Sequence, residues 1–544
     1  MPQDVEPHPS PAARWLFADQ LGPSALDGLA HDVPVVLIES MAQLGSRRWH
    51  RAKLHLVLVA LRSRAAELGE RAIHVTAGDH ASGLAATGLA ASTIEAIEPT
   101  SRAAEALVRR LGLARIVRNT GFATHRDEFA EWARDRGDRR LLLEDFQRWQ
   151  RLRHGVLVED GEPVGGRWNL DADNREPPPR GATTLGLAAP WAPVEGEIDE
   201  QVRADLDRWT AEGRISTIGE DGPRWFAATR SEALAALEHF IATRLAAFGP
   251  YEDAMLDADP AMAHSLLSVP LNLGLLHPLE VVRAAETAYH EGRAPLNSVE
   301  GFVRQVLGWR EYVWGLYWWF GEDYRHANTL EARAPVPDWL EDLDAHRTVR
   351  AACVSATLRD VREHGWTHHI PRLMVLGNLA LQRGIDPRAL TDWFHRAFVD
   401  GHDWVMLPNV VGMSQWADGG RMATKPYAAG GAYLDRMGDH CRRCPYDPKV
   451  RVGPTACPFT AGYWAFLDRN AERLAGNHRM SRALAGRRRL ADLDEVVAQE
   501  AARGGSAPCG AEPPRRGRAR RGAPRSGRWR TPATRAGSWP RGSG

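Results

Sequence analysis

Short apolar runs alternate with amphipathic stretches in the first part of the chain. A strongly helical stretch at 47–68 separates the second run from the third. Buried parallel strands read as short, continuous apolar runs, and the helices between them cover the faces of the sheet. The pattern predicts an α/β domain over 1–145 with a parallel, Rossmann-like sheet. The expected strands are 14–17, 33–38, 71–75 and 114–117.

Acidic residues follow two of these predicted strands. Asp19 comes after the first and Glu39 directly after the second. Open parallel sheets bind ligands beyond the carboxyl ends of their strands, so both residues are candidates for ligand binding. The sequence contains neither GxGxxG nor GxxxxGK[ST], which argues against a dinucleotide or ATP phosphate loop in this domain.

The pattern changes twice further along. Glycine and proline become frequent over 146–230, which predicts a long connector packed on the surface. From 231 to 502 the apolar spacing is helical almost throughout, and Ser231 followed by Glu232 is typical of a capped helix start. We therefore predict a large all-α domain over 231–502.

The charge of the chain is unevenly distributed. From Arg503 onward there are eleven arginines and a single acid, Glu512, and we expect 503–544 to be a disordered tail. The rest of the chain is net acidic, so any nucleic-acid surface on the folded body must be a local basic patch. No apolar run approaches the roughly 20 residues that a membrane span needs.

Four of the five cysteines are candidates for a metal site: Cys353, the pair Cys441 and Cys444, and Cys457. The last three fall inside one short stretch in a spacing that suits a metal. Nothing resembling a signal peptide precedes the first domain, so we expect these thiols in a reducing, cytoplasmic setting. There a CxxC with further cysteines is typical of metal or redox chemistry. Zinc and an iron–sulfur cluster both fit, and unligated core cysteines are the alternative.

Two adjacent histidines precede a proline in the helical region. Pro371 predicts a helix start, because proline is favoured at the first helical position. His368 and His369 would then lie by the helix N-terminus, where a positive imidazole is disfavoured, as suits a group that relays a proton. If the helix runs through instead, His368 and Arg372 share a face. Plain hydrogen-bonding histidines are the alternative.

Three further groups could carry chemistry. Asp400 and Asp403 beside Gly401 could pair with Arg372 or bind ligand hydroxyls, or be ordinary turn residues. His264, Ser265 and Ser268 could cradle a phosphate at a helix start, or simply cap it. Trp309 and Arg310 beside Glu311 could line a cofactor, and a buried ion pair is the simpler interpretation. The 20 tryptophans fit core packing, or stacking and electron transfer.

Together these motifs resemble the photolyase/cryptochrome family. Ser265 and Ser268 match its clamp on the FAD phosphates, and Arg372 and Asp400 match its salt bridge near the isoalloxazine ring. The cysteines are similar to those of the iron–sulfur bacterial cryptochromes and (6-4) photolyases. Other matching signatures are 165–169, 407–414, 417–420 and 425–427. The resemblance extends to about Ala502.

The resemblance implies light-driven electron transfer from reduced FAD to a pyrimidine (6-4) pyrimidone lesion in UV-damaged DNA. We expect the protein to be a monomer. The resemblance also implies His369 as proton donor, assisted by His368, with Tyr427 and Tyr433 near the lesion and Trp393 in electron transfer. Leu373 stands where animal (6-4) photolyases have a further histidine. The implied FAD residues are His264, Ser265, Ser268, Gln305, Trp309, Arg310, Arg372, Asp400, Asp403 and Asn409.

Two more cofactors follow from the resemblance. Cys353, Cys441, Cys444 and Cys457 would hold a 4Fe-4S cluster. Asp19 and Glu39 would hold a 6,7-dimethyl-8-ribityllumazine antenna. The alternatives are a blue-light-sensing cryptochrome with a signalling role, a photolyase for cyclobutane dimers, which the paired histidines disfavour, and a zinc-stabilised DNA-binding protein without light chemistry.

Overall fold

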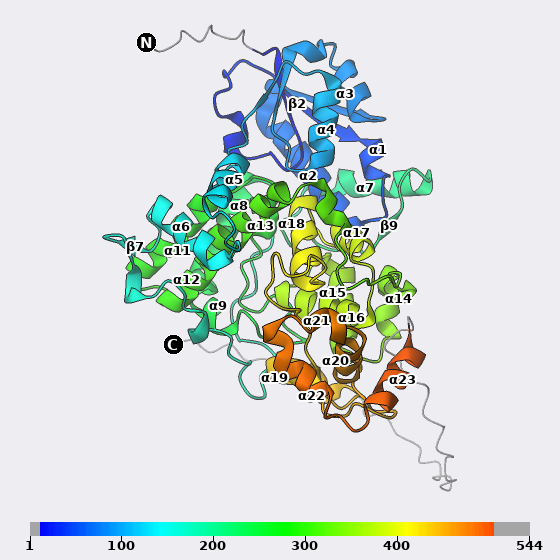
Figure 1. Ribbon diagram of the computed structural model, residues 1–544. Coiled ribbons are helices and arrows are strands. Elements are labelled where there is room, and N and C mark those ends of the chain that lie inside the picture. Colours follow the sequence, from blue (N-terminus) through cyan, green and yellow to red (C-terminus); the bar gives the residue numbers. More distant parts are fainter. Residues whose placement is uncertain (1–10, 505–544) are drawn as a thin grey trace, which may run out of the picture. The chain divides into compact units, whose positions relative to one another are not determined.

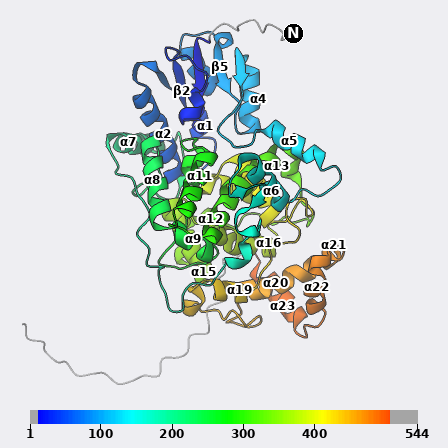
Figure 2. The same cartoon turned by 90° about the vertical axis from the view of Figure 1, so that its left-hand side faces the viewer.

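A computed structural model describes residues 11–504 of the chain, all within one compact unit (Figure 1). The expectation of a disordered tail concerns 503–544, and all but the first two of these residues lie outside the described ones. Cys509 also lies outside them. Figures 1 and 2 both show a sheet at one end of this unit and a cluster of short helices at the other.

The N-terminal part is built on a five-stranded parallel sheet, as the sequence predicts. The strand order is β4-β2-β1-β5-β6, and all neighbouring pairs are parallel. The strands are β1 (Ala13–Leu16), β2 (Val35–Ser40), β4 (Ala72–Ala77), β5 (Ile94–Ile97) and β6 (Arg115–Val117).

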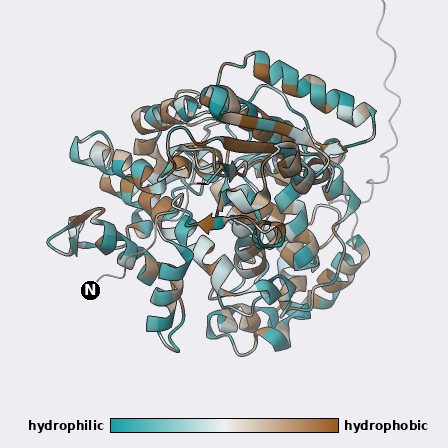
Figure 3. Ribbon diagram, turned by 90° about the horizontal axis from the view of Figure 1, so that it is seen from above, coloured by the Kyte–Doolittle hydropathy of each residue, from teal (hydrophilic) through white to brown (hydrophobic). Residues whose placement is uncertain are grey.

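Side chains of the sheet alternate between two cores, and Figure 3 shows hydrophobic residues concentrated along the strands. Val35 and Leu37 face the long helix α2 (Arg51–Leu68). Val36 and Ile38 share a second core with α3 (His80–Ala86) and α4 (Arg102–Leu111). Because successive side chains of a strand point to opposite faces, the domain has three layers, with the sheet in the middle.

Strand β5 was not predicted. Glu95 at its centre is fully buried and forms ion pairs with Arg14, at 2.7 Å, and with Arg115. A buried charge between Ile94 and Ala96 interrupts the apolar run that marked the other strands. The pairing arginines come from neighbouring strands, so the short segment becomes recognisable only once the sheet is assembled.

The remainder of residues 11–504 is largely helical, as predicted. Its first helix after the connector, α8 (Arg230–Thr243), begins one residue before Ser231. Its cap is Thr229, whose side chain accepts a hydrogen bond from the Glu232 amide, while Glu232 accepts one in return. The prediction of Ser231 as the cap was wrong, because Thr229 completes the reciprocal pair with Glu232.

The other helices complete this region. They are α9 (Leu245–Tyr251), α10 (Ser268–Asn272), α11 (Pro278–His290), α12 (Leu296–Val303), α13 (Glu311–Trp319), α14 (Asp338–Glu341), α15 (Ala352–His364), α16 (Asn378–Arg383), α17 (Pro387–Ala397), α18 (Asp403–Pro408), α19 (Gly431–Met437), α20 (Pro458–Arg469), α21 (Ala471–Leu474), α22 (Ser481–Arg487) and α23 (Leu493–Arg503).

Within residues 11–504, three π-helical segments interrupt the helices, at Arg304–Arg310, Pro371–Gly377 and Asn409–Ser414. Their wider turns are costly and occur mostly where function needs them. All three contain residues that the sequence assigns to a cofactor site, which are Gln305, Trp309, Arg310, Arg372 and Asn409. The apolar spacing of the sequence does not distinguish a π turn from an α turn.

The predicted connector is more structured than its glycine and proline content suggests. It contains α7 (Glu197–Ala211), a short hairpin of β7 (Val158–Glu159) and β8 (Glu162–Pro163), and strand β9 (Thr217–Ile218), which pairs with β3 (Trp49–His50). Helix α6 (Leu143–His154) runs across its expected start, and α5 (Arg126–Asp135) precedes it. The domain boundaries stay predictions.

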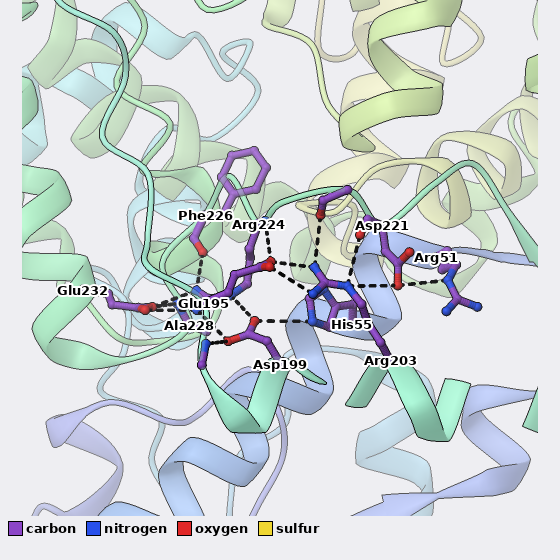
Figure 4. Close-up of polar contacts among 12 residues, drawn as sticks. Arg51, His55, Glu195, Asp199, Arg203, Asp221, Arg224, Phe226, Ala228 and Glu232 are labelled. Carbon is purple, nitrogen blue, oxygen red and sulfur yellow. Dashed lines mark hydrogen bonds and ion pairs between the residues drawn. The ribbon is translucent and has the colours of Figure 1, made fainter. Parts of the chain in front are cut away.

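A buried polar network ties the connector to α2 (Figure 4). Arg224 bonds Asp199 at 2.8 Å and binds both oxygens of Glu232, and His55 Nε2 lies 3.4 Å from Asp199 Oδ1. Arg203 holds Glu195 through two further bonds. Each buried charge has an opposite partner, so the network fixes the connector against the sheet domain.

Candidate functional site

The centre of the helical region is a buried ion pair between Arg372 and Asp400. Two guanidinium nitrogens lie 2.8 and 3.0 Å from the two Asp400 oxygens, and Ser268 Oγ donates to the same carboxylate at 2.8 Å. Burial alone would raise the pKa of Asp400, but the charge and hydrogen bonds of Arg372 and Ser268 outweigh it and hold that pKa below its ordinary value. A fixed, ionised acid therefore sits where three elements meet.

A lysine of the sheet domain supports this centre. Lys53 Nζ donates to the backbone oxygens of His395, at 2.7 Å, and Gly401, at 2.5 Å, next to Asp400. Burial lowers the pKa of Lys53 to about 7. Sequence reasoning missed Lys53, although a lone lysine in the apolar start of helix α2 was a usable signal.

Arg310 forms a second buried pair beside this centre, with Glu311 at 2.6 Å. Its guanidinium also donates to the Leu271 carbonyl in α10 and lies 4.3 Å from the Phe122 ring centroid. The predicted ion pair is therefore present. Ser268 is the first residue of α10, so Arg310 contacts the same short helix that carries Ser268.

The remaining predicted cofactor residues are more dispersed. Ser265 Oγ accepts from the Leu267 amide, and Leu266 between them has a φ of 57°, a strained value typical of functional loops. Asp403 accepts from Tyr317 and pairs with Arg325. Asn409 donates to Val405 in its own helix. Gln305 and Trp309 are half-buried on the first π-helical segment.

Three histidines form a cluster next to the Arg372–Asp400 centre. His264 and His368 are buried and stack with ring centroids 4.3 Å apart, and His369 meets both rings edge-on. Burial holds the pKa of His264 and of His368 well below the ordinary value, so both are neutral at pH 7. Since the side chain of His369 is 47% exposed, it is the member that a ligand can reach.

Helix geometry around the cluster differs from the expectation. The helix begins at His369 and not at Pro371, and the Arg372 amide reaches the His368 carbonyl at 3.4 Å. His368 Nδ1 lies 3.4 Å from the Ile370 amide and so occupies the capping position. The His368 side chain accepts from a free amide of the first turn, so the helix can begin before Pro371.

Two acids that sequence reasoning missed lie beside His369. Asp253 Oδ1 is 3.3 Å from His369 Nε2, and Asp253 also pairs with Arg175 at 3.6 Å. Burial opposes ionisation of Asp253, yet the His369 and Arg175 contacts hold its pKa below the ordinary value. Its neighbour Glu252 is buried, and its Oε2 has no hydrogen-bond partner within residues 11–504.

Replacing Glu252 with glutamine should remove a pH-dependent loss of stability. Burial raises the pKa of Glu252 to about 7 from 4.5. The folded chain therefore holds this proton more tightly, and stability falls as pH rises from 4.5 to 7. At about 1.4 kcal/mol per pKa unit, Glu252→Gln should be more stable than the parent at pH 8 by on the order of 3 kcal/mol. Thermal unfolding at pH 5 and 8 measures this.

The exposed Glu238→Gln is the matched control and should leave both melting curves unchanged. An equal effect of Glu252→Gln at the two pH values would contradict the assignment.

Two tyrosines lie near the histidine cluster. Tyr427 and Tyr433 are half-buried, burial raises the pKa of each phenol, and the charge of Arg175 is close to both. Asp253 is also close to Tyr433. The tyrosines, Arg175, Asp253 and His369 thus form one partly open surface.

Trp393 lies behind the Arg372–Asp400 centre. It is fully buried, and its Nε1 donates to the Leu340 carbonyl at 2.8 Å. Its ring is edge-on to Phe398 at 5.9 Å, and the Arg372 guanidinium lies 4.3 Å from the Phe398 centroid. One aromatic ring therefore separates Trp393 from Arg372.

The four predicted cysteines gather between α15, α19 and α20. Burial and the charges of the other three thiols raise the pKa of Cys353 well above its ordinary value, which requires all four to be close. A Cβ on Gly431 would lie 2.9 Å from Cys457 Sγ, so glycine is needed there.

The sulfurs are nevertheless spread out. Among residues 11–504, the His, Cys, Asp or Glu ligand atoms that gather in threes within 4.8 Å belong to His264–His368–His369 and His55–Glu195–Asp199. No three cysteine sulfurs lie that close. A tetrahedral zinc with bonds of about 2.3 Å would need its sulfurs about 3.8 Å apart.

At the carboxyl edge of the sheet, Asp19 and Glu39 differ in environment. Burial raises the pKa of Asp19, and Thr100 Oγ1 donates to it in a short hydrogen bond. Burial opposes ionisation of Glu39, but His74 and Arg62 lower its pKa to about 2. One edge thus carries a carboxyl whose pKa is raised by burial, Asp19, and a fixed anion, Glu39.

Known proteins are similar to this chain in sequence. A family model described as deoxyribodipyrimidine photo-lyase-related protein matches residues 14–220. The chain is 40% identical to a (6-4) photolyase of Agrobacterium fabrum (strain C58) over 500 residues, which cover 88% of this chain and 95% of that protein.

Two solved structures are similar in fold. A bacterial class III photolyase from Agrobacterium tumefaciens has a TM-score of 0.53 at 19% identity, covering 87% of this chain and 100% of that one. A Synechocystis sp. PCC6803 cryptochrome has a TM-score of 0.50 at 14% identity, covering 78% and 88%. The sheet followed by a helical region is thus the architecture shared by photolyases and cryptochromes. Within that class, the chain belongs to the deoxyribodipyrimidine photolyase-related family.

No helix among the described residues is long and apolar enough to cross a membrane.

Proposed function

We propose that the chain is a light-dependent photolyase that repairs pyrimidine (6-4) pyrimidone photoproducts in UV-damaged DNA. The observation that carries the proposal is the 40% identity to a (6-4) photolyase over nearly the whole of both proteins. The histidine cluster supports it, because His369 offers an accessible imidazole paired with a carboxylate on an open surface.

The buried centre around Arg372 and Asp400 would hold FAD, which in its reduced form supplies the light-excited electron for repair. The fit is supported by polar atoms that are buried without a hydrogen-bond partner in the described part of the chain: His264 Nε2, Arg310 Nε and Thr367 Oγ1. Buried polar groups are nearly always satisfied, so these atoms suit contact with a polar ligand. Ser265 and Ser268 would face its phosphates.

His369 would act as the general acid on the lesion. Asp253, whose Oδ1 lies 3.3 Å from His369 Nε2, would hold the imidazole in position for that role. His264 and His368 stay neutral and pack against the His369 ring, so they would hold its position. A lesion base must leave the DNA stack to reach this group, and Tyr427 and Tyr433 would flank it.

The four cysteines would bind a 4Fe-4S cluster. The spacing of their sulfurs supports a cluster over a single zinc ion, because each iron of a cluster takes one thiolate and the sulfurs then stand further apart. A structural role is our preference, since the ligands join α15 to segments almost ninety residues later in the chain, from Cys353 to Cys441.

Asp19 and Glu39 would hold the antenna, 6,7-dimethyl-8-ribityllumazine. They differ in a way that supports this, because burial raises the pKa of Asp19, whereas Glu39 stays an ionised acceptor held by His74 and Arg62. Trp393 would pass electrons to the flavin, which its position one ring from Arg372 supports.

Lesion preference tests the proposal. Matched oligonucleotides carrying either a (6-4) photoproduct or a cyclobutane dimer are illuminated with the purified holoprotein. We expect only the (6-4) photoproduct to be reversed. Reversal of the dimer alone would assign the other photolyase activity, and reversal of neither would favour a signalling cryptochrome.

A further inference from the structure

One segment of the folded body carries a large net positive charge. Residues 421–489 contain fourteen lysines and arginines and five acids. Residues 1–420 contain 44 lysines and arginines and 59 acids. Residues 421–489 thus carry a net charge of +9, whereas residues 1–420 carry −15. Figures 1 and 2 show those helices, α19 to α22, at the end opposite the sheet.

Four exposed arginines at α22 are not neutralised by acids. Arg482, Arg488 and Arg489 have no acidic side chain within ion-pair distance in residues 11–504, and Arg479 donates only to Thr424 Oγ1, at 2.7 Å. We call these four residues the α22 surface. Nearby arginines behave differently: Arg473 pairs with Glu331, and Arg487 pairs with Asp468.

The α22 surface adjoins the proposed lesion site. Besides the Arg479 contact, Asn477 donates to the Thr424 carbonyl at 3.1 Å. Tyr427 follows three residues later and packs in the same apolar cluster as Leu474 and Met480.

Beyond Tyr427 the contacts continue to the proposed acid. The charges of Arg175 and Arg479 both act on Tyr427. Arg175 pairs with Asp253, and Asp253 pairs with His369. A continuous series of neighbours therefore joins the α22 surface to His369.

We propose that the α22 surface binds the phosphates of the DNA duplex that flanks the lesion. The inference rests on the proposed function for the location of the lesion. Each arginine that neutralises a phosphate releases condensed counterions, so binding becomes salt-dependent without reading sequence. Residues 479–489 contain no aromatic side chain, whereas surfaces for single strands stack bases on aromatic rings. Duplex backbone is therefore the ligand that fits.

The test replaces three of the arginines in the full-length holoprotein: Arg482→Gln, Arg488→Gln and Arg489→Gln together. Arg479 is left because it contacts Thr424. We measure the Kd for undamaged and for (6-4)-containing duplex against salt concentration. With about 0.9 counterions released per contact, the slope of log K against log salt should shrink by about 2.7 for both duplexes. The ratio of the two affinities should stay unchanged.

The matched control neutralises three exposed arginines of α4 and the connector, Arg110→Gln, Arg208→Gln and Arg214→Gln, of which Arg208 and Arg214 pair with acids. It carries the same arginine-rich tail and should keep the full slope. If the triple variant fails to retain flavin, the single variants Arg482→Gln, Arg488→Gln and Arg489→Gln are compared, each with an expected loss of about 0.9.

An unchanged slope in correctly folded variants overturns the inference. Repair by the parent protein is assayed separately. Binding that depends on the α22 surface without any repair would contradict the proposed function and leave this inference standing. Repair together with an unchanged slope would support the proposed function and overturn this inference.

Discussion

Replacing His369 with alanine should abolish repair of the (6-4) photoproduct while FAD stays bound and still photoreduces. General acids contribute about 10²- to 10⁴-fold to a reaction, so we expect a loss of at least about 100-fold. His369 is half-exposed and forms no hydrogen bond or ion pair with Arg372 or Asp400, so its removal should leave the proposed flavin centre intact. The rate of lesion reversal under saturating light, with the flavin absorbance recorded in parallel, measures both.

Two variants sharpen this result. The exposed His478→Ala should repair at the parental rate, because it lies outside the cluster. Asp253→Asn should keep His369 but remove the carboxylate that holds its ring at 3.3 Å, so repair should fall below the parental rate. Repair by His369→Ala at a parental rate would remove it from the chemistry.

Replacing Cys441 with serine should give protein that is insoluble, or soluble but without cluster colour. Serine is a poor ligand for iron, and the remaining thiols would then have to hold the cluster alone. The site lies against a large apolar core that includes Cys353, Cys457 and Tyr446, so its loss should expose that core. Iron content and thermal unfolding measure the effect.

Cys509→Ser is the matched control, since Cys509 is the one cysteine outside the predicted ligand set. It should retain iron and stability. A Cys441→Ser protein that is soluble, fully active and rich in iron would mean that the cluster or its structural role is wrongly assigned.

Local pattern was sufficient for much of the fold. Four strands and the helix at 47–68 were predicted because their apolar side chains lie in short runs or at helical spacing. Strand β5 was missed because Glu95 is buried by pairing with arginines from other strands. Helix α7 was missed between glycine- and proline-rich stretches, although Val202, Leu206 and Trp209 are helically spaced and buried.

Some contacts of the candidate site were predicted because their residues belong to recognisable sequence motifs. The Arg372–Asp400 pair and the gathering of the cysteines agree with prediction. Lys53, Glu252 and Asp253 were not predicted, because their burial and their partners arise only from tertiary packing. The π-helical segments also escape prediction, since a single extra residue in a turn leaves the apolar spacing nearly unchanged.

The central claim is that light drives repair of a (6-4) photoproduct by this chain. Its most direct test incubates the purified holoprotein with a (6-4)-containing oligonucleotide in blue light and in darkness, and quantifies intact thymines by chromatography. We expect restored thymines in the illuminated sample alone. A lesion that persists in light, although the flavin is photoreduced, would contradict it.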